Sequence, residues 1–133
     1  RELVLIAGGV GITPLLSMLL HRIESDADVS GLVFIHCCRD PAHHVMANEL
    51  RHLSAQHGFR YYVSYETGSG ADHQGYLDQT VLSQWLTQPD ADVYFCGPKP
   101  FMAAINRQLL DMGYTDEQLH YEVFGPGTRL LTH

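Results

Sequence analysis

Short runs of consecutive apolar residues alternate along the chain with longer segments whose apolar residues recur at helical spacing. The apolar runs cover residues 3–7, 31–38, 59–65, 92–96 and 118–124. Such short, largely apolar runs are typical of strands buried on both faces of a parallel sheet. We therefore predict five strands, of which the third is rich in aromatic and β-branched residues.

Helical spacing predicts four helices between these strands, over about residues 13–24, 43–57, 78–86 and 101–112. Gly58 stands where a helix commonly ends, one residue past its last turn. Regular alternation of strands and helices predicts an α/β fold of Rossmann-like type, with a five-stranded parallel sheet and helices on both faces. Residues 1–133 form one domain in this prediction.

Glycine and proline gather where the predicted strands end, which is the edge of a parallel sheet where ligands bind. The first such turn has the sequence Gly8-Gly9-Val10-Gly11-Ile12-Thr13-Pro14. It resembles a dinucleotide-binding fingerprint with Pro14 in the last glycine position. Glycines let the backbone approach a pyrophosphate closely, and the N–H groups of the following helix face the phosphates. The alternative is a turn that only joins a strand to a helix.

Two further turns contain residues that could take part in ligand binding or catalysis. Cys96-Gly97-Pro98 ends the fourth strand, so the Cys96 thiol could lie beside a bound ring, or it could simply pack in the core. Arg39 and Asp40 follow the second strand, where nucleotide-binding folds meet the adenosine ribose. An acidic residue there favours NAD and an arginine accommodates a 2′-phosphate, so the pair leaves the choice open. Asp40 could instead be an N-cap and Arg39 a surface residue.

Charge excludes two classes of partner. The chain has 8 Lys and Arg against 15 Asp and Glu, a formal net charge of −7 over 133 residues. Such a surface does not suit the phosphates of nucleic acid or of an anionic membrane. No apolar run approaches the roughly 20 residues of a membrane span.

The numbers and spacing of the cysteines and histidines bear on disulfide bonds and metal sites. The chain has three cysteines, and a small, odd number does not fit the disulfide framework of a secreted protein. The cysteine count therefore favours a cytoplasmic protein. The nine histidines are densest from His43 to His52, where His44 and His52 could share a helix face. The segment lacks His-Glu-x-x-His, and Cys-x-x-Cys occurs nowhere. We therefore predict a solvated helix face there and no metal site.

The ordered set of motifs resembles the NAD(P)H-binding C-terminal domain of the ferredoxin–NADP reductase superfamily, and within it the flavohaemoglobin family. The resemblance is carried by Gly8–Pro14, Gly75-Tyr76-Leu77, Cys96-Gly97-Pro98 and the ending Tyr121-Glu122-Val123-Phe124-Gly125-Pro126. The ending is the part most specific to flavohaemoglobin. The resemblance covers about residues 3–127.

The resemblance implies a reductase domain cut from a longer protein. NADH or NADPH would bind at the carboxyl edge of the sheet and pass a hydride to FAD in a preceding barrel domain, which would reduce haem in a globin domain. Haem-bound oxygen would then convert nitric oxide to nitrate. The turn from Gly9 to Pro14 would hold the pyrophosphate. The other nucleotide-binding residues would be Gly8, Arg39, Gly75, Gly97 and Pro98. Cys96 would lie near the nicotinamide, and Glu122 and Phe124 near the flavin, as the catalytic residues.

The sequence also departs from the family pattern. The flavin-binding Arg-x-Tyr-Ser/Thr motif is missing, because Arg60-Tyr61-Tyr62 is followed by Val63. No globin-like stretch is present either, so we expect the isolated domain to be inactive. Two alternatives stay open: the same domain in another flavin reductase that serves an oxygenase or an iron–sulfur protein, and a stand-alone nucleotide-binding module. The resemblance favours NADH, whereas Arg39 leaves NADPH open.

Overall fold

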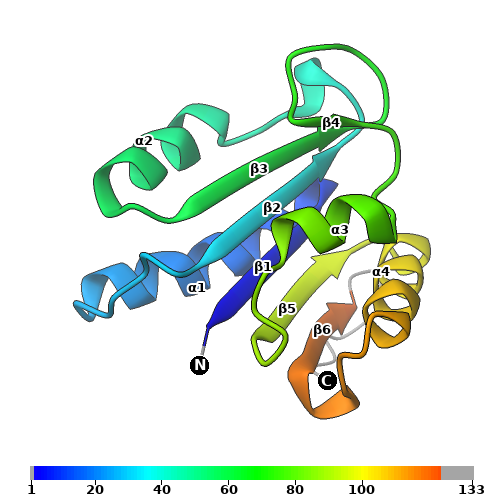
Figure 1. Cartoon of the computed structure of the whole chain (residues 1–133). Coiled ribbons are helices and arrows are strands. Elements are labelled where there is room, and N and C mark those ends of the chain that lie inside the picture. Colours follow the sequence, from blue (N-terminus) through cyan, green and yellow to red (C-terminus); the bar gives the residue numbers. More distant parts are fainter. Residues whose placement is uncertain (1, 124–133) are drawn as a thin grey trace.

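A parallel sheet with the strand order β4-β3-β2-β1-β5-β6 forms the centre of the computed structural model, which describes residues 2–123 (Figure 1). The strands are β1 (Leu3–Gly8), β2 (Val33–Cys38), β3 (Arg60–Tyr65), β4 (His73–Gln74), β5 (Asp92–Gly97) and β6 (Leu119–Val123). The helices are α1 (Ile12–Glu24), α2 (Ala47–His57), α3 (Gln79–Trp85) and α4 (Lys99–Asp111). The α/β class and the parallel sheet are therefore confirmed.

Strand β1 lies at the centre of this sheet, and all six of its residues are buried. It pairs with β2 on one side and β5 on the other, so that Ala7 stands opposite both His36 and Cys96. Strand β6 continues the sheet and places Glu122 opposite Cys96. Because all these pairs are parallel, the carboxyl ends of the strands meet at one edge of the sheet.

The prediction of five strands is wrong, since the sheet has a sixth strand, β4. This strand has only two residues, His73 and Gln74, which pair with Ser64 and Tyr65 of β3. Both are polar, and they lie in a glycine-rich segment that carries no strand pattern of its own. The pairing arises because the chain returns along β3, which is a tertiary cause that local sequence does not reveal.

The prediction that one helix covers residues 43–57 is wrong at its start, because α2 begins only at Ala47. Asp40 caps a separate 3-10 turn, η2 (Pro41–His43), by accepting a hydrogen bond from the His43 N–H. Met46 then adopts a left-handed conformation, with φ of 62°, and breaks helical continuity before Ala47. His44 and His52 therefore do not share a helix. The predicted end is confirmed, because Gly58 adopts φ of 80° directly after His57.

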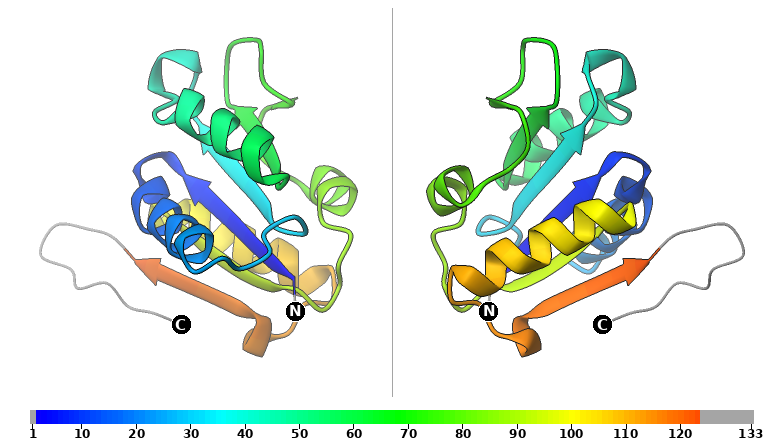
Figure 2. Two further views of the ribbon diagram at one scale, coloured as in Figure 1. Left: turned by 90° about the vertical axis from the view of Figure 1, so that its left-hand side faces the viewer. Right: turned by 90° about the vertical axis from the view of Figure 1, so that its right-hand side faces the viewer.

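Alternate residues of β1 belong to two different hydrophobic clusters. Leu3, Leu5 and Ala7 pack with α1 and with Leu50 of α2. Val4 and Ile6 pack with residues of α3 and α4. Since successive side chains of a strand point to opposite faces, α1 and α2 cover one face of the sheet and α3 and α4 the other (Figure 2).

None of the helices within residues 2–123 has the length and apolar character that crossing a membrane requires.

Candidate functional site

A pocket of about 500 Å³ opens at the carboxyl edge of the sheet, between the strand ends and α4. Five residues that the sequence predicted as nucleotide-binding line it: Gly8, Gly9, Arg39, Gly75 and Pro98. They come from four separate parts of the chain, and the parallel topology brings them together. Volumes of this size are typical of small-molecule sites. The pocket is therefore the candidate binding site.

Phe101 of α4 forms part of the pocket wall and explains two of the glycines around it. A Cβ atom on Gly8 would lie 2.7 Å from Cδ2 of the Phe101 ring, and one on Gly97 would lie at the same distance. Any larger residue at either position would displace the ring. Phe101 was not among the predicted site residues, although it directly follows the Gly97–Pro100 turn. Its position after that turn was the available signal.

The glycine turn itself is a short 3-10 helix, η1 (Gly9–Gly11), that leads into α1. Gly9 has φ of 55°, and a Cβ there would meet nothing within 4 Å, so this part of the turn is open. Gly11 is the opposite case, because a Cβ there would collide with the backbone of Cys96. Gly11 therefore allows the turn to pack directly on β5.

The other predicted residues of the turn lie outside the pocket. Val10 and Thr13 are exposed, whereas the Ile12 side chain is 2% exposed and belongs to the core. Pro14 lines a second, smaller cavity of about 80 Å³.

Cys96 is 1% exposed and lines that smaller cavity with Pro14, His120 and Tyr121. Of the next two residues, Pro98 lines the larger pocket, whereas Gly97 does not line it and lies against the Phe101 ring. The backbone of Glu122 pairs with Cys96, so the structure brings two of the three predicted catalytic residues to neighbouring positions on adjacent strands. The third, Phe124, lies outside the described residues.

Polar groups hold the far wall of the pocket in place. The Ser64 hydroxyl donates a 2.9 Å hydrogen bond to the carbonyl oxygen of Gly75, and the Gly75 N–H donates to the Tyr65 carbonyl at 2.7 Å. Gln108 of α4 donates from Nε2 to the Leu77 carbonyl at 2.8 Å. Its Oε1 is buried and accepts no hydrogen bond from the described residues.

Charged groups of both signs stand at the pocket mouth. Arg39 and Glu66 both line the pocket and are exposed. A hydrogen bond to Glu66 raises the pKa of the Tyr76 hydroxyl above its usual value. Asp40 is not a wall residue: the side chain and N–H of His43 bond to its carboxylate and hold the pKa of that group below its usual range. The prediction that Asp40 acts as an N-cap is confirmed.

His36 lies beneath the glycine turn and was missed by sequence reasoning. It is fully buried on β2, and its Nε2 lies 3.1 Å from the carbonyl oxygen of Gly9. Burial lowers the pKa of the imidazole to about 4, so the ring is neutral at physiological pH. The neutral ring then donates from Nε2 to Gly9. A polar residue within the apolar run 31–38 was the only signal of this contact.

The chain is similar to known proteins in sequence and in fold. Residues 5–107 match the model of the oxidoreductase NAD-binding domain. The chain is 44% identical to the flavohemoprotein of Pseudomonas putida over 135 residues, which cover 98% of this chain and 34% of that protein. The chain thus spans about a third of the length of the curated relatives it matches.

Two solved structures have the same fold. The flavohem-like FAD/NAD-binding domain of nitric oxide dioxygenase from Vibrio cholerae superposes with a TM-score of 0.83 at 35% identity, covering 95% of this chain and 52% of that one. The flavohemoglobin of Malassezia yamatoensis, with bound FAD and haem, superposes with a TM-score of 0.84 at 25% identity, covering 94% of this chain and 32% of that chain.

The chain belongs to the oxidoreductase NAD-binding domain family, since the family model matches well over half of its length. The resemblance to flavohaemoglobin is confirmed by these relatives.

Proposed function

We propose that this chain is the NAD(P)H-binding part of a flavohaemoglobin-type enzyme and delivers a hydride from NADH or NADPH to FAD held by another domain of the same polypeptide. The observation that carries the proposal is the convergence of Gly8, Gly9, Arg39, Gly75 and Pro98 on one pocket at the carboxyl edge of the sheet. That edge is where open α/β sheets bind their ligands. The family match and the flavohemoprotein relatives support the same function.

The residues of the pocket fit a nicotinamide nucleotide. Gly9 adopts a positive φ and leaves open space where a side chain would stand, so a phosphate can approach its backbone. Arg39 supplies a positive charge at the mouth. Gln108 also lines the pocket, and its side-chain amide is of a type that hydrogen-bonds to the amide or amino group of a base.

When bound, reduced nicotinamide supplies two electrons and one proton as a hydride, and oxidised nucleotide remains. The residues of this chain bind and orient the donor ring. Pro98 limits the pocket at the end of β5, and Phe101 closes the wall behind Gly8 and Gly97. Cys96 and Glu122 stand side by side at the adjoining strand ends, where we propose that they, with Phe124, border the nicotinamide and the flavin.

In the whole protein, we propose that haem in a globin domain receives electrons singly from the flavin, and that nitric oxide combines there with dioxygen, the oxidant, and one electron to give nitrate. The length of the curated relatives, about three times that of this chain, leaves room for both further domains. The relative of known structure from Vibrio cholerae is a nitric oxide dioxygenase. The low, odd cysteine count supports a cytoplasmic location.

Anaerobic rapid mixing of the full-length protein with NADH or NADPH tests the proposal. The flavin absorbance should bleach at a rate that saturates with nucleotide concentration, and haem reduction should follow. Nucleotide binding without flavin bleaching would contradict the proposal and favour a stand-alone binding module. Flavin bleaching in a protein that holds no haem would favour a reductase that serves another acceptor.

A further inference from the structure

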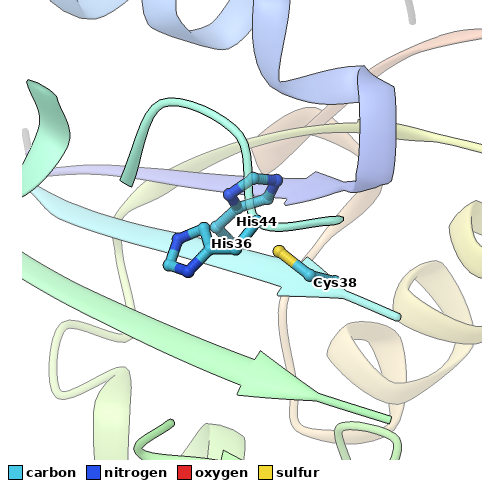
Figure 3. Close-up of side chains that lie close together, drawn as sticks. All are labelled: His36, Cys38 and His44. Atoms are coloured by element: carbon cyan, nitrogen blue, oxygen red, sulfur yellow. The ribbon is translucent and has the colours of Figure 1, made fainter. Parts of the chain in front are cut away.

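Three side chains gather on one face of β2, and of these Cys38 also lines the nucleotide pocket, whereas His36 and His44 do not. His36 and Cys38 are two positions apart on this strand and therefore point to the same face. His44 reaches them from the segment that links η2 to α2 (Figure 3). Their potential ligand atoms all lie within 4.8 Å of one another, and no other such group of three occurs in residues 2–123. His36 and Cys38 are buried, and His44 is half-buried.

The hydrogen bond of His36 to the glycine turn decides which of its ring atoms is available. Nε2 lies 3.1 Å from the Gly9 carbonyl, which can only accept, so Nε2 carries the proton. Nδ1 then holds a lone pair. That atom is buried and has no hydrogen-bond partner among the described residues. A metal-bound histidine commonly donates its second ring N–H to a backbone carbonyl, so His36 already has the outer contact of a metal ligand.

Two tyrosines of β3 orient His44. Its Nδ1 lies 2.8 Å from the Tyr65 hydroxyl, and its Nε2 lies 2.7 Å from the Tyr61 hydroxyl. A neutral imidazole donates to one of these hydroxyls and accepts from the other. A cation would take the place of the donating hydroxyl, while the other tyrosine would keep the ring in position. His44 thus has one exchangeable and one fixed contact.

We propose that His36, Cys38 and His44 form a binding site for Zn²⁺. Imidazole nitrogen and thiolate sulfur are both ligands that zinc takes in proteins, and three such ligands leave a fourth position to water or to a displaced tyrosine hydroxyl. Bonds of about 2.0 to 2.3 Å to zinc require ligand atoms roughly 3.3–3.8 Å apart. The cluster must therefore close by about 1 Å. His44 can move toward the two strand residues, because it lies outside the regular helices and strands.

Binding of the cation replaces the proton of the Cys38 thiol, which is released to solvent. The charges around the cluster are mixed in sign. The negative charge of Asp40 interacts electrostatically with Cys38, and that of Asp72 with Tyr61. The positive charge of Arg51 interacts with both Tyr61 and His44. Because one arginine and two carboxylates interact with the cluster, the net electrostatic field at the site does not repel Zn²⁺.

Zinc analysis of the purified full-length protein tests the site. After equilibration with Zn²⁺ and passage over chelating resin, the wild type should hold about one more zinc ion per chain than His44→Gln or Cys38→Ser. Zinc K-edge X-ray absorption should show one sulfur at about 2.3 Å and nitrogens at about 2.0 Å. Competition with a chromophoric chelator should show at least tenfold weaker binding in each variant.

The chain offers matched controls for both substitutions. Cys37→Ser changes the neighbouring thiol and His43→Gln the neighbouring imidazole, and neither residue belongs to the cluster. Both should keep the wild-type zinc content. Circular dichroism shows whether each variant folds. If Cys38→Ser fails to fold, His44→Gln still tests the site, because His44 lies outside the core. Equal zinc in the wild type and in His44→Gln, or zinc without a sulfur ligand, would overturn the proposal.

Discussion

The Nε2 atom of His36 lies 3.1 Å from the carbonyl oxygen of Gly9, although the two residues are 27 positions apart in the chain. This contact joins the buried face of β2 to the turn that begins the candidate nucleotide site. Gly9 lines the pocket, and its positive φ leaves its backbone open to a ligand. His36 therefore holds the conformation of the turn from beneath, without itself lining the pocket.

Replacing His36 by leucine should loosen the turn. The lost hydrogen bond is worth about 1 kcal/mol, so nucleotide affinity should fall about fivefold. His36→Gln keeps an N–H donor and should restore most of the affinity. Titration of the full-length protein with NADH by calorimetry measures both values. Equal affinities for the leucine and glutamine variants would show that the hydrogen bond does not position the turn.

Gly11→Ala should reduce stability more than a glycine substitution at an open position. Its new Cβ would collide with the Cys96 carbonyl and lie 2.8 Å from the Gly97 nitrogen, so β5 or the turn must shift. We expect a loss of about 2–3 kcal/mol in the free energy of unfolding, measured by urea denaturation.

Gly113→Ala is the matched control for this substitution. Gly113 has φ of 103°, and a Cβ there would meet nothing within 4 Å. Only backbone strain opposes alanine there, at a cost of about 1–2 kcal/mol. If Gly11→Ala were no more damaging than this control, the packing of the turn on β5 would not depend on glycine.

Arg39 and Glu66 should tune the choice between NADH and NADPH in opposite directions, because both line the mouth of the pocket. Arg39→Ala should weaken NADPH binding about tenfold by removing a partner of the 2′-phosphate, and NADH binding less than about twofold. Glu66→Gln removes a negative charge and should strengthen NADPH binding slightly. Dissociation constants of both nucleotides for each variant measure this. A parallel loss of both nucleotides in Arg39→Ala would place the 2′-phosphate elsewhere.

Cys96→Ser should slow flavin reduction more than it weakens nucleotide binding. The Cys96 side chain is 1% exposed, and it directly precedes the Gly97-Pro98 turn that reaches the pocket. A change at this strand end shifts the donor ring relative to the flavin, whereas the open backbone of Gly9, where we propose that a phosphate binds, is unaltered. We expect about a tenfold lower limiting rate with a dissociation constant within about twofold of the wild type. An unchanged rate would mean that Cys96 serves core packing alone.

Most of the sheet was predictable from the sequence because its strands are buried runs with a strong local signal. Leu3–Gly8 is buried at every position, and the turns after the strands are marked by glycine and proline. Strand β4 was not predictable, because His73 and Gln74 become a strand only through pairing with β3. The late start of α2 depends on the cap at Asp40 and the left-handed Met46, which compete with a helical pattern that begins earlier.

The candidate site was predictable where a residue lies directly after a strand, and less so where the contact depends on packing. Gly8, Gly9 and Pro98 follow from their position at the carboxyl edge. Phe101 became a wall residue only because two glycines allow its ring to lie over the strand ends. His44 was interpreted as part of a solvated helix face, whereas it bonds to Tyr61 and Tyr65. Those tyrosines lie 17 and 21 residues away, so no local pattern could place them.

The most direct test of the proposed function compares two neighbouring alanines of α4. Ala104 lines the pocket and Ala103 does not, while both are exposed on the same helix. Ala104→Trp would fill part of the 500 Å³ volume, and Ala103→Trp would add the same side chain outside it. The measurement is the rate of flavin reduction in the full-length protein as a function of nucleotide concentration. The proposal predicts that Ala104→Trp raises the half-saturating concentration at least about tenfold, with Ala103→Trp within about twofold of the wild type. Equal behaviour of the two variants would contradict it.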